Sequence, residues 1–419
     1  MSANATVLAG IRIADFSRVL VGPVCTRILG TLGAEVIRVE WHQRPDQFRR
    51  FEPYLGERSV DNSGLFHALN YSKKSVDFDL TQPWGVQAGL DLIAVSDVVI
   101  ENFRAGQFAA MGFTREAIER ANPEVISIGI GGLGQSGPER TYVAYGNSLH
   151  AYSGIVALTG YPGEEGLGIS GTWADPVSGL FAATVVLAAL EAKRAGRLPG
   201  MCVIDQSMVD CLITTLPEGV IAAQVDPERT RPSGNRSAVH APQGVIPARG
   251  DDRWIAFSVQ SYAQFRRLIA IAGLSGYDDP SLFSVPARRR IEDQFLSDLS
   301  RWSRDLDVVE LICRLRDAGM AAGVVSHAGD LATHTEFAAR DFMRLIRINH
   351  TNEMRHPGVP WTTSHPNSLT FGPPPALGEH TAEVMHEILG YPEPPILNMH
   401  PRPDEDSPFP AREGGRGVR

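Results

Sequence analysis

The stretch that decides the fold runs from Ile11 to Glu40 and reads IRIADFSRVLVGPVCTRILGTLGAEVIRVE. Residues 11–17 and 34–40 are short apolar segments typical of buried strands, whereas residues 22–33 have the length and spacing of an apolar helix. Short apolar strands separated by helices are the pattern of a parallel α/β sheet. We therefore expect the chain to begin with a strand, a helix and a second strand of one parallel sheet.

The same alternation continues to about residue 200. Helices are predicted over 81–96 and 114–123, and strands over 97–103 and 125–132. The apolar segment 170–192 then predicts a long buried helix. We therefore expect the first ~200 residues to form a doubly wound, Rossmann-like α/β domain.

The remaining sequence predicts a second, smaller domain. At 419 residues the chain exceeds what one hydrophobic core usually supports. After a helix predicted over 203–224, residues 225–242 are polar and contain proline and arginine, as linkers do. We expect a large α/β domain over 1–215 to which residues 340–400 return, a linker over 216–239, a small α+β domain over 240–330, and a disordered tail over 400–419.

Composition disfavours several classes of protein. The formal net charge is −9, and no run of Lys and Arg is long enough to follow a phosphate backbone, so nucleic acid is not an expected partner. The cysteines at 25, 202, 211 and 313 form no C-x-x-C pair and have no histidine at metal-ligand spacing, so neither disulfides nor a metal site are expected. The first residues lack the pattern of a signal peptide, and no window is judged long and apolar enough to span a bilayer. We expect a cytoplasmic protein without a membrane partner.

One motif suggests a dinucleotide site. GLGQSG, at Gly132–Gly137, is a literal G-x-G-x-x-G that directly follows a predicted strand. A dinucleotide fingerprint also requires a helix that begins at the third glycine, because the helical N–H groups bind the pyrophosphate. Here Pro138 and a loop-like segment follow the third glycine. The motif therefore does not favour a nicotinamide or flavin site.

A single carboxylate stands at the start of the long apolar helix, in SGTWADPVSG (170–179). Asp175 followed by Pro176 is how many helices begin, with the aspartate as N-cap and the proline as the first helical residue. A catalytic carboxylate at the same place is the alternative. From this segment alone the capping interpretation is favoured.

Seven segments in order along the chain carry a resemblance to a known family. They read ADFSRVLVGPVCTRILGTLGAEVIRVE, NYSKKSVDFDL, VVIENFRAG, GQSGP, SGTWADPVSG, SGNRSAVHAPQGVIP and HPGVPW…PPALGEHT. In these segments the chain resembles the family III CoA-transferases, the group that contains formyl-CoA:oxalate and carnitine CoA-transferases. The resemblance covers nearly the whole chain.

The resemblance implies an activity and an assembly. It implies transfer of CoA from an acyl-CoA to a carboxylic acid, with Asp175 as the nucleophile, through an aspartyl mixed anhydride and an aspartyl-CoA thioester. No metal or tightly bound cofactor is implied, and CoA enters as substrate. We expect Asp175 to stay ionised, because N–H groups at a helix N-terminus favour negative charge. Family members form interlocked homodimers, each chain a ring threaded by the other, and the same is expected here.

The resemblance also implies positions for CoA binding. They are Leu20 and Val21, Trp41, Phe78 and Asp79, and Asn102, Phe103 and Arg104. An arginine that the family usually has eight residues after the motif asparagine is Ala110 in this chain. Arg104 either replaces this contact with a CoA phosphate or is an ordinary surface arginine.

Two alternatives remain. The same fold hosts α-methylacyl-CoA racemases, whose His-Asp pair corresponds here to Tyr145 and Gly146, and neither residue is a base at neutral pH. Gly146 also replaces an acid found in many of the transferases. Tyr145 and Met208 fall where the family lines the acyl pocket, and Met208 can equally be a core residue. The second alternative is a CoA-binding subunit of a hetero-oligomeric transferase.

Overall fold

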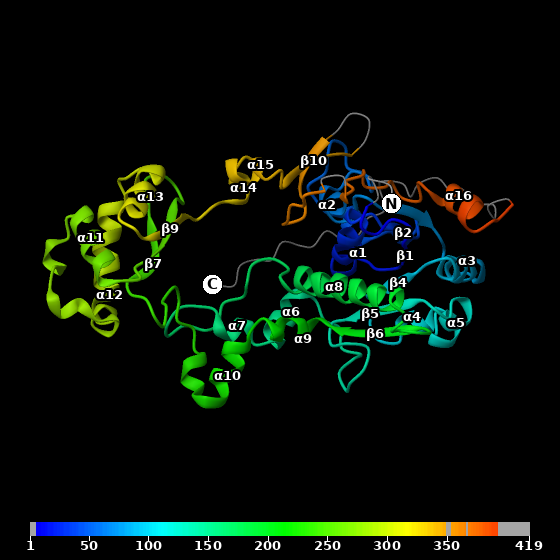
Figure 1. Cartoon of the computed structure of the whole chain (residues 1–419), viewed down its shortest axis with the longest axis horizontal. Coiled ribbons are helices and arrows are strands. Elements are labelled where there is room, and N and C mark those ends of the chain that lie inside the picture. Colours follow the sequence, from blue (N-terminus) through cyan, green and yellow to red (C-terminus); the bar gives the residue numbers. More distant parts are fainter. Residues whose placement is uncertain (1–5, 349–352, 366–367, 393–419) are drawn as a thin grey trace. The chain divides into compact units, whose positions relative to one another are not determined.

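The computed structural model describes residues 6–348, 353–365 and 368–392 of the chain (Figure 1). Six parallel strands form one sheet in the order β3-β2-β1-β4-β5-β6. They are β1 (Arg12–Asp15), β2 (Glu35–Glu40), β3 (Lys74–Asp77), β4 (Val98–Glu101), β5 (Ile126–Gly131) and β6 (Cys202–Ser207). This is the order of a doubly wound sheet, in which a crevice opens outside the carboxyl ends of β1 and β4. The predicted α/β class is confirmed.

Helices cover both faces of this sheet. Successive residues of a strand face opposite sides, so Ile13 of β1 lies in the core on one face and Ala14 lies in the core on the other. Both are fully buried, which accounts for the nearly continuous apolar sequence of the strands. The helices around the sheet are α1 (Val21–Thr31), α2 (Gly64–Asn70), α3 (Pro83–Ala94), α4 (Gln107–Ala110), α5 (Arg115–Ala121), α6 (Gly146–Tyr152), α8 (Ala174–Arg194) and α9 (Met208–Thr214), with the 3-10 turn η1 (Gln47–Arg50). The returning segment adds the hairpin β10 (Met343–Arg347) and β11 (Glu353–Pro357), then α16 (Thr381–Glu383) and the π-helical turn η6 (Val384–Ile388).

Helix α8 packs closely on α1. A Cβ on Gly179 would lie 2.8 Å from the carbonyl oxygen of Val21, so glycine is needed for this approach. Within the described residues, α8 is long and apolar enough to span a membrane by length and composition alone. The helices Met208–Thr214 and Pro217–Val225, which are joined by a short bend, would count as a second such span if the two were treated as one helix. The prediction that no segment reaches this length and hydropathy is therefore wrong. Because α8 buries small residues such as Ala182 and Ala183 against the sheet, it is accounted for as a core helix.

The predicted elements of the sheet are largely found, and β6 is the main correction. The sequence around Asp205 is predicted to be helical, but residues 202–207 form a strand paired with β5. Within β6, Val203 is 49% exposed. An edge strand with exposed residues does not show the apolar run that identifies a buried strand.

The chain divides into two compact units, which we describe separately. The first comprises the described residues of Met1–Ser153, Ile169–Pro217 and Ala338–Arg419, and the second comprises Gly154–Gly168 and Glu218–Phe337. Residues 154–168, predicted within the large domain, thus belong to the second unit. The expected linker over 216–239 contains helix α10 (Pro217–Val225). The expected tail over 400–419 lies outside the described residues.

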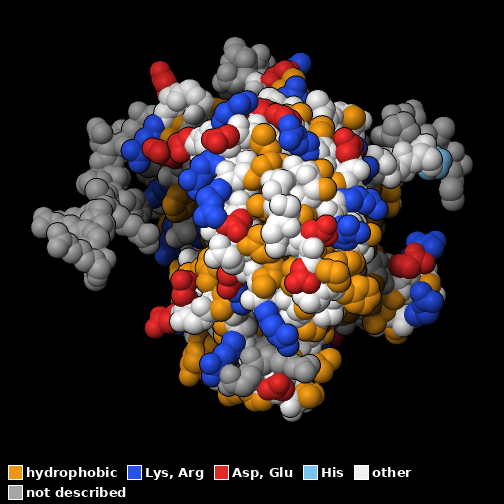
Figure 2. Space-filling view, turned by 90° about the vertical axis from the view of Figure 1, so that its left-hand side faces the viewer, with side chains coloured by type: hydrophobic (Ala, Val, Ile, Leu, Met, Phe, Trp, Pro, Cys, Tyr) orange, Lys and Arg blue, Asp and Glu red, His pale blue; other side chains and the backbone are white. Residues whose placement is uncertain are grey.

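The second unit has its own sheet and core. Its antiparallel sheet has the order β7-β8-β9, and Phe265, Phe295 and Leu311 are fully buried against it. The elements are β7 (Gln243–Pro247), β8 (Trp254–Ser258), β9 (Ala321–Val324), α7 (Ile155–Leu158), α11 (Tyr262–Ala272), α12 (Val285–Ser303), α13 (Val308–Asp317), α14 (Ala328–Ala332) and, at its boundary, α10 and α15 (Thr335–Ala339), with the 3-10 turns η2 (Pro227–Thr230), η3 (Ser275–Tyr277) and η4 (Pro280–Phe283). On the face of the molecule seen in Figure 2, Lys and Arg side chains are interspersed with Asp and Glu.

Candidate active site

Asp175 lies in the first turn of α8 but is not its N-cap. The N-cap is Trp173, the helix begins at Ala174, and the Asp175 N–H donates to the carbonyl of Thr172 at 3.2 Å. The capping interpretation of Asp175 is therefore wrong. Its carboxylate does not cap the N-terminus of the helix and is available for other contacts.

Three helices begin around this carboxylate. The backbone N–H groups of Asp175 itself and of Val21, the first residue of α1, lower the pKa of this carboxyl. A Cβ built on Gly146, the first residue of α6, would lie 3.2 Å from Asp175 Oδ2. The first N–H groups of a helix have no partner within it, and the helix dipole adds partial positive charge there. The fold thus places Asp175 where negative charge is stabilised by backbone alone.

Burial nevertheless dominates the titration of Asp175. It raises the pKa of the carboxyl to about 6, against the opposing effect of the two N–H groups. The helix N-termini therefore do not offset the effect of burial on this carboxyl. Asp175 is ionised at neutral pH, but its charge is poorly compensated.

His150 is a residue of this site that the sequence did not reveal. It lies on α6, is 1% exposed, and its Nε2 is 3.1 Å from the backbone N of Ala174. Because the N–H can only donate, Nε2 accepts and is unprotonated, and burial also lowers the pKa of the imidazole. His150 therefore holds the first turn of α8 as a neutral side chain. A lone histidine in a helix gives no sequence signal for such a role.

The two positions expected to line an acyl pocket differ in exposure. Tyr145 is the N-cap of α6, next to Gly146, and its side chain is 68% exposed. Met208 begins α9 and is buried in the core with Val209 and Leu212. The geometry thus places Tyr145 beside Gly146, the residue next to the Asp175 carboxylate, and packs Met208 in the core.

The positions expected to bind CoA follow the carboxyl ends of four adjacent strands. Leu20 and Val21 follow β1, Trp41 follows β2, Phe78 and Asp79 follow β3, and Asn102, Phe103 and Arg104 follow β4. The carboxyl ends of parallel strands meet at one edge of the sheet, so the fold brings these segments to the same edge.

The side chains at these positions are not equally available to a ligand. Phe78 is fully buried, and Leu20 is 7% exposed. The Asn102 carboxamide is occupied by the backbone of Arg18, accepting from its N–H at 2.7 Å and donating to its carbonyl at 2.8 Å. Arg104 is exposed. Asn102 therefore acts on the loop after β1, and Arg104 is the cation that remains accessible.

The GLGQSG segment forms a loop held by an acid. Asp205 of β6 accepts from the Gln135 N–H and the Ser136 hydroxyl, both at 2.6 Å. No helix begins at Gly137, and the next helix is α6. A carboxylate thus occupies one backbone N–H and one hydroxyl of the loop that would bind phosphate in a dinucleotide site.

Comparison with known proteins gives the family. A family model described as CoA-transferase family III matches residues 8–381. The chain belongs to this family. It is 30% identical over 388 residues to the succinyl-CoA–L-malate CoA-transferase alpha subunit of Chloroflexus aurantiacus, covering 91% of this chain and 89% of that protein. It is 27% identical to the succinate–glutarate CoA-transferase of Agrobacterium fabrum, covering 91% and 95%.

Solved structures agree with the fold. A CAIB/BAIF family protein from Brucella suis superposes with a TM-score of 0.83 at 27% identity, covering 91% of this chain and 99% of that one. A Mycobacterium tuberculosis protein has a TM-score of 0.75 at 22% identity, with the same coverage, and supports the fold alone. The family and the named relatives identify the protein as a CoA-transferase, a class of enzyme that uses CoA thioesters as substrates. Within the described residues no group of three or more His, Cys, Asp or Glu side chains could hold a metal ion.

Proposed function

We propose that the enzyme moves CoA from an acyl-CoA to a carboxylic acid, with Asp175 as the nucleophile. The observation that carries this proposal is the Asp175 carboxylate itself, which lies at helix N-termini and, among the described residues, has no compensating cation. Gly146 supports it, because a residue without a side chain leaves space 3.2 Å from Oδ2. A poorly compensated, oriented carboxylate is a good nucleophile toward a thioester.

The reaction divides into two balanced steps and their reversal. An Asp175 oxygen attacks the thioester carbonyl, and the C–S bond breaks. CoA thiolate is the leaving group, and the acyl group stays on Asp175 as a mixed anhydride. The thiolate then attacks the aspartyl carbonyl, releasing the donor's carboxylate and leaving an aspartyl-CoA thioester. The acceptor carboxylate attacks this thioester to form a second anhydride, and the thiolate attacks its acyl carbonyl, so that acyl-CoA is formed and Asp175 is regenerated.

The N–H of Val21 has a defined task in this scheme. It lowers the pKa of the Asp175 carboxyl in the resting enzyme, as a nearby donor does. When the aspartyl carbonyl is attacked, negative charge develops on an oxygen of the same group, and a fixed donor stabilises it. Removing one such donor in other acyl-transfer enzymes costs roughly 3–4 kcal/mol of the activation barrier. Gly179 lies inside α8, and its lack of a Cβ serves helix packing.

The racemase alternative has less support. A racemase needs a pair of groups that take and return the α-proton, and neither Tyr145 nor Gly146 can act as a base at neutral pH. His150 lies nearby, but its Nε2 is engaged by Ala174.

The expected homodimer and the substrates belong to the same proposal. Side chains on α8 and α10 are exposed and apolar, at 53% for Leu180, 61% for Ile221 and 76% for Val225, and a second copy of this chain would cover them. The names of the relatives suggest succinyl-CoA as the first donor to test, with L-malate and glutarate as acceptors. All four cysteines are free thiols, in keeping with a cytoplasmic enzyme.

Replacement of Asp175 tests the mechanism. Asp175→Asn keeps the shape of the side chain but cannot form an anhydride, so we expect turnover to fall by several orders of magnitude. Wild-type enzyme incubated with acyl-CoA and then hydroxylamine should acquire a hydroxamate at Asp175, detected by mass spectrometry of its peptides.

The matched control is Glu116→Gln, which also removes an acid from the second position of a helix, α5. This variant should keep full turnover. Full activity in Asp175→Asn, or labelling confined to another acid, would exclude Asp175 as the nucleophile.

A further inference from the structure

Glu101 is a buried acid that the proposed mechanism does not use. It ends β4, directly before the expected CoA-binding residues Asn102, Phe103 and Arg104, and it is 7% exposed. Its carboxylate accepts two hydrogen bonds, from the Phe103 N–H to Oε2 at 2.6 Å and from Gln135 Nε2 to Oε1 at 3.1 Å. The carboxylate therefore joins the loop after β4 to the GLGQSG loop after β5.

The Gln135 side chain holds the same loop from a second side. Its amide nitrogen donates to Glu101 and also to the Phe103 carbonyl, at 3.2 Å, so both of its hydrogens are used. The backbone N–H of Gln135 donates to Asp205 of β6 at 2.6 Å, which anchors the side chain to the neighbouring strand. Phe103 is thus held by its N–H through Glu101 and by its carbonyl through Gln135.

Gly129 of β5 leaves the space for this contact. It pairs with Glu101 across the two strands, and a Cβ built on it would lie 2.6 Å from Glu101 Oε1 and 3.0 Å from Gln135 Cγ. A larger residue at this position would have to displace one of the two side chains. The contact between Glu101 and Gln135 therefore belongs to the packed interior of the sheet.

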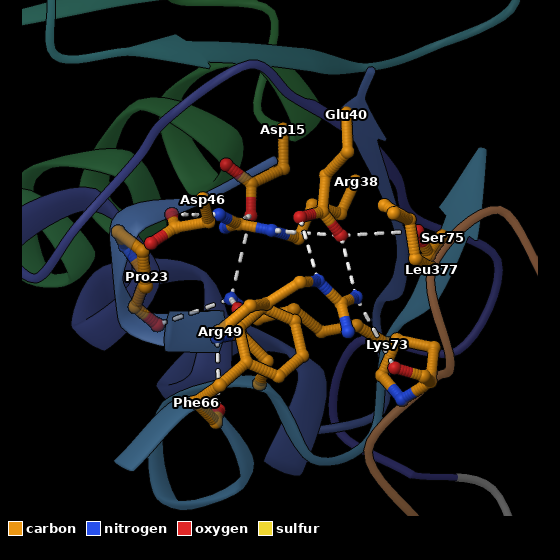
Figure 3. A network of polar contacts seen from close by, with 12 residues as sticks. Asp15, Pro23, Arg38, Glu40, Asp46, Arg49, Phe66, Lys73, Ser75 and Leu377 are labelled. Carbon is orange, nitrogen blue, oxygen red and sulfur yellow. Dashed lines mark hydrogen bonds and ion pairs between the residues drawn. The ribbon is translucent and has the colours of Figure 1, made fainter. Parts of the chain in front are cut away.

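Glu101 differs in its electrostatic surroundings from other buried acids of the large unit. Figure 3 shows such acids in contact with cations, the acids being Asp15, Glu40 and Asp46 and the cations Arg38, Arg49 and Lys73. The two donors at Glu101 are uncharged, and within the described residues no cation lowers its pKa. Burial raises the pKa of Glu101 to about 7, and the negative charge of Asp205 acts in the same direction, against the effect of the Phe103 N–H.

The hydrogen bonds around Glu101 suit its ionised form. An ionised carboxylate accepts at both oxygens, and here each oxygen faces an N–H donor. A proton on either oxygen would compete with one of these donors. If the Gln135 amide turned its oxygen toward that proton, it would also lose its hydrogen bond to the Phe103 carbonyl. Ionised Glu101 therefore holds the loop better than the protonated form does.

We propose that ionised Glu101 is a positioning residue for acyl-CoA, which keeps residues 102–104 in the conformation that binds CoA through the Phe103 N–H and the Gln135 amide. This inference rests on the proposed function, since it takes these residues as part of the CoA site. Loss of the charge should weaken binding of CoA and have little effect on the reaction of bound acyl-CoA at Asp175.

The test is the binding of CoA to Glu101→Gln, measured by isothermal titration calorimetry. Glutamine keeps the size of the side chain but carries no charge. At about pH 8.5, where wild-type Glu101 is ionised, Kd for CoA should rise about tenfold, because a hydrogen bond to a charged group is lost. At about pH 5.5, where the wild type is itself protonated, the two Kd values should converge. Titration of the CoA phosphates cancels in the ratio of the two values, since both proteins bind the same ligand.

Steady-state kinetics give a second measurement. At about pH 8.5, Glu101→Gln should raise KM for acyl-CoA with kcat nearly unchanged, because the loop after β4 acts on binding of ground and transition states alike. The matched control is Asp97→Asn. Asp97 directly precedes β4, at the opposite end of the strand, and also accepts a backbone N–H, from Arg12 at 2.8 Å. This variant should leave Kd and KM unchanged.

A second variant tests the contact between the two side chains. Gln135→Met removes both amide donors and keeps Glu101, so at about pH 8.5 it should raise Kd about as much as Glu101→Gln does. The double variant should bind CoA no more weakly than either single variant, because both changes remove the same contact.

A Kd for folded Glu101→Gln at pH 8.5 equal to that of Asp97→Asn would overturn the proposal. A ratio to the wild type that stays constant from pH 8.5 to pH 5.5, or losses that add in the double variant, would overturn it as well. The binding measurement needs no turnover. Failure of the CoA-transfer mechanism would instead appear as absent labelling at Asp175 in wild-type enzyme that binds CoA, so the two failures are distinguishable.

Discussion

Two carboxylates of the large unit lie in opposite electrostatic surroundings. Glu40 is held by the Arg49 guanidinium at 2.9 and 2.7 Å and faces Arg38, and these cations lower its pKa to about 2 although burial opposes this. For Asp175, no cation of the described residues lowers the pKa, the opposing effect comes from backbone N–H groups, and burial raises the pKa to about 6. A buried acid with cations stabilises the fold, whereas an acid without them keeps its charge at a cost in stability. The second kind is the one available for chemistry.

The largest effect is expected on the compensated side of this comparison. Glu40→Gln should reduce the free energy of unfolding by about 3 kcal/mol at pH 7, because a buried charge pair loses one member. The folded-state pKa of Glu40 is lowered from 4.5, so its contribution is present above about pH 4.5 and is lost as the pH falls toward about 2. Urea denaturation at pH 7 and pH 3 measures both predictions.

The control for this prediction is Glu35→Gln. Glu35 forms ion pairs with Arg12 and Lys74, but its side chain is 32% exposed. Pairs of this kind contribute about 0–1 kcal/mol. Equal losses of stability in the two variants would contradict the distinction between buried and exposed acids.

The opposite sign is expected at Asp175. Its folded-state pKa is raised above the usual value of 3.8, so the ionised form destabilises the protein at pH 7, and this cost disappears as the pH falls below about 4. Asp175→Asn should therefore increase the free energy of unfolding by about 1–2 kcal/mol at pH 7, after allowance for partial solvent screening. At pH 4 the gain should be much smaller. An inactive variant that is no more stable than the wild type at pH 7 would show that the carboxylate is better compensated than its surroundings indicate.

The sequence predicted the parts of the fold that depend on local pattern. The alternation over residues 11–40 identified β1, α1 and β2, because buried parallel strands are continuous apolar runs. The same reasoning failed at β6, where the exposed Val203 interrupts the pattern of a buried strand. The position of Asp175 at the start of a helix was also readable, since it depends on neighbouring residues.

The buried ion pairs and the surroundings of Asp175 could not be predicted from local sequence pattern. Arg38 and Glu40 alternate along β2 as residues facing solvent would, yet they are 0% and 6% exposed. Their partners Asp15, Asp46 and Arg49 come from other elements, and only the tertiary structure brings them together. The same holds for the N–H of Val21 and for His150, whose relation to Asp175 depends on three helices that are distant in sequence.

Arg104 extends the comparison from acids to cationic side chains. Its replacement is expected to have the smallest effect of those predicted here. Arg38 and Arg49 are fully buried and paired, whereas within the described residues Arg104 is exposed and has no ion-pair partner. If it binds a CoA phosphate, it acts far from the reacting carbonyl and stabilises ground and transition states alike. Arg104→Ala should then raise KM for acyl-CoA about five- to tenfold with kcat nearly unchanged, and Ala110→Arg should lower KM. Steady-state kinetics would compare both with Arg115→Ala, an exposed arginine on α5 for which no change is expected. A KM in Arg104→Ala equal to that of Arg115→Ala would identify Arg104 as an ordinary surface residue and leave the phosphates to other groups.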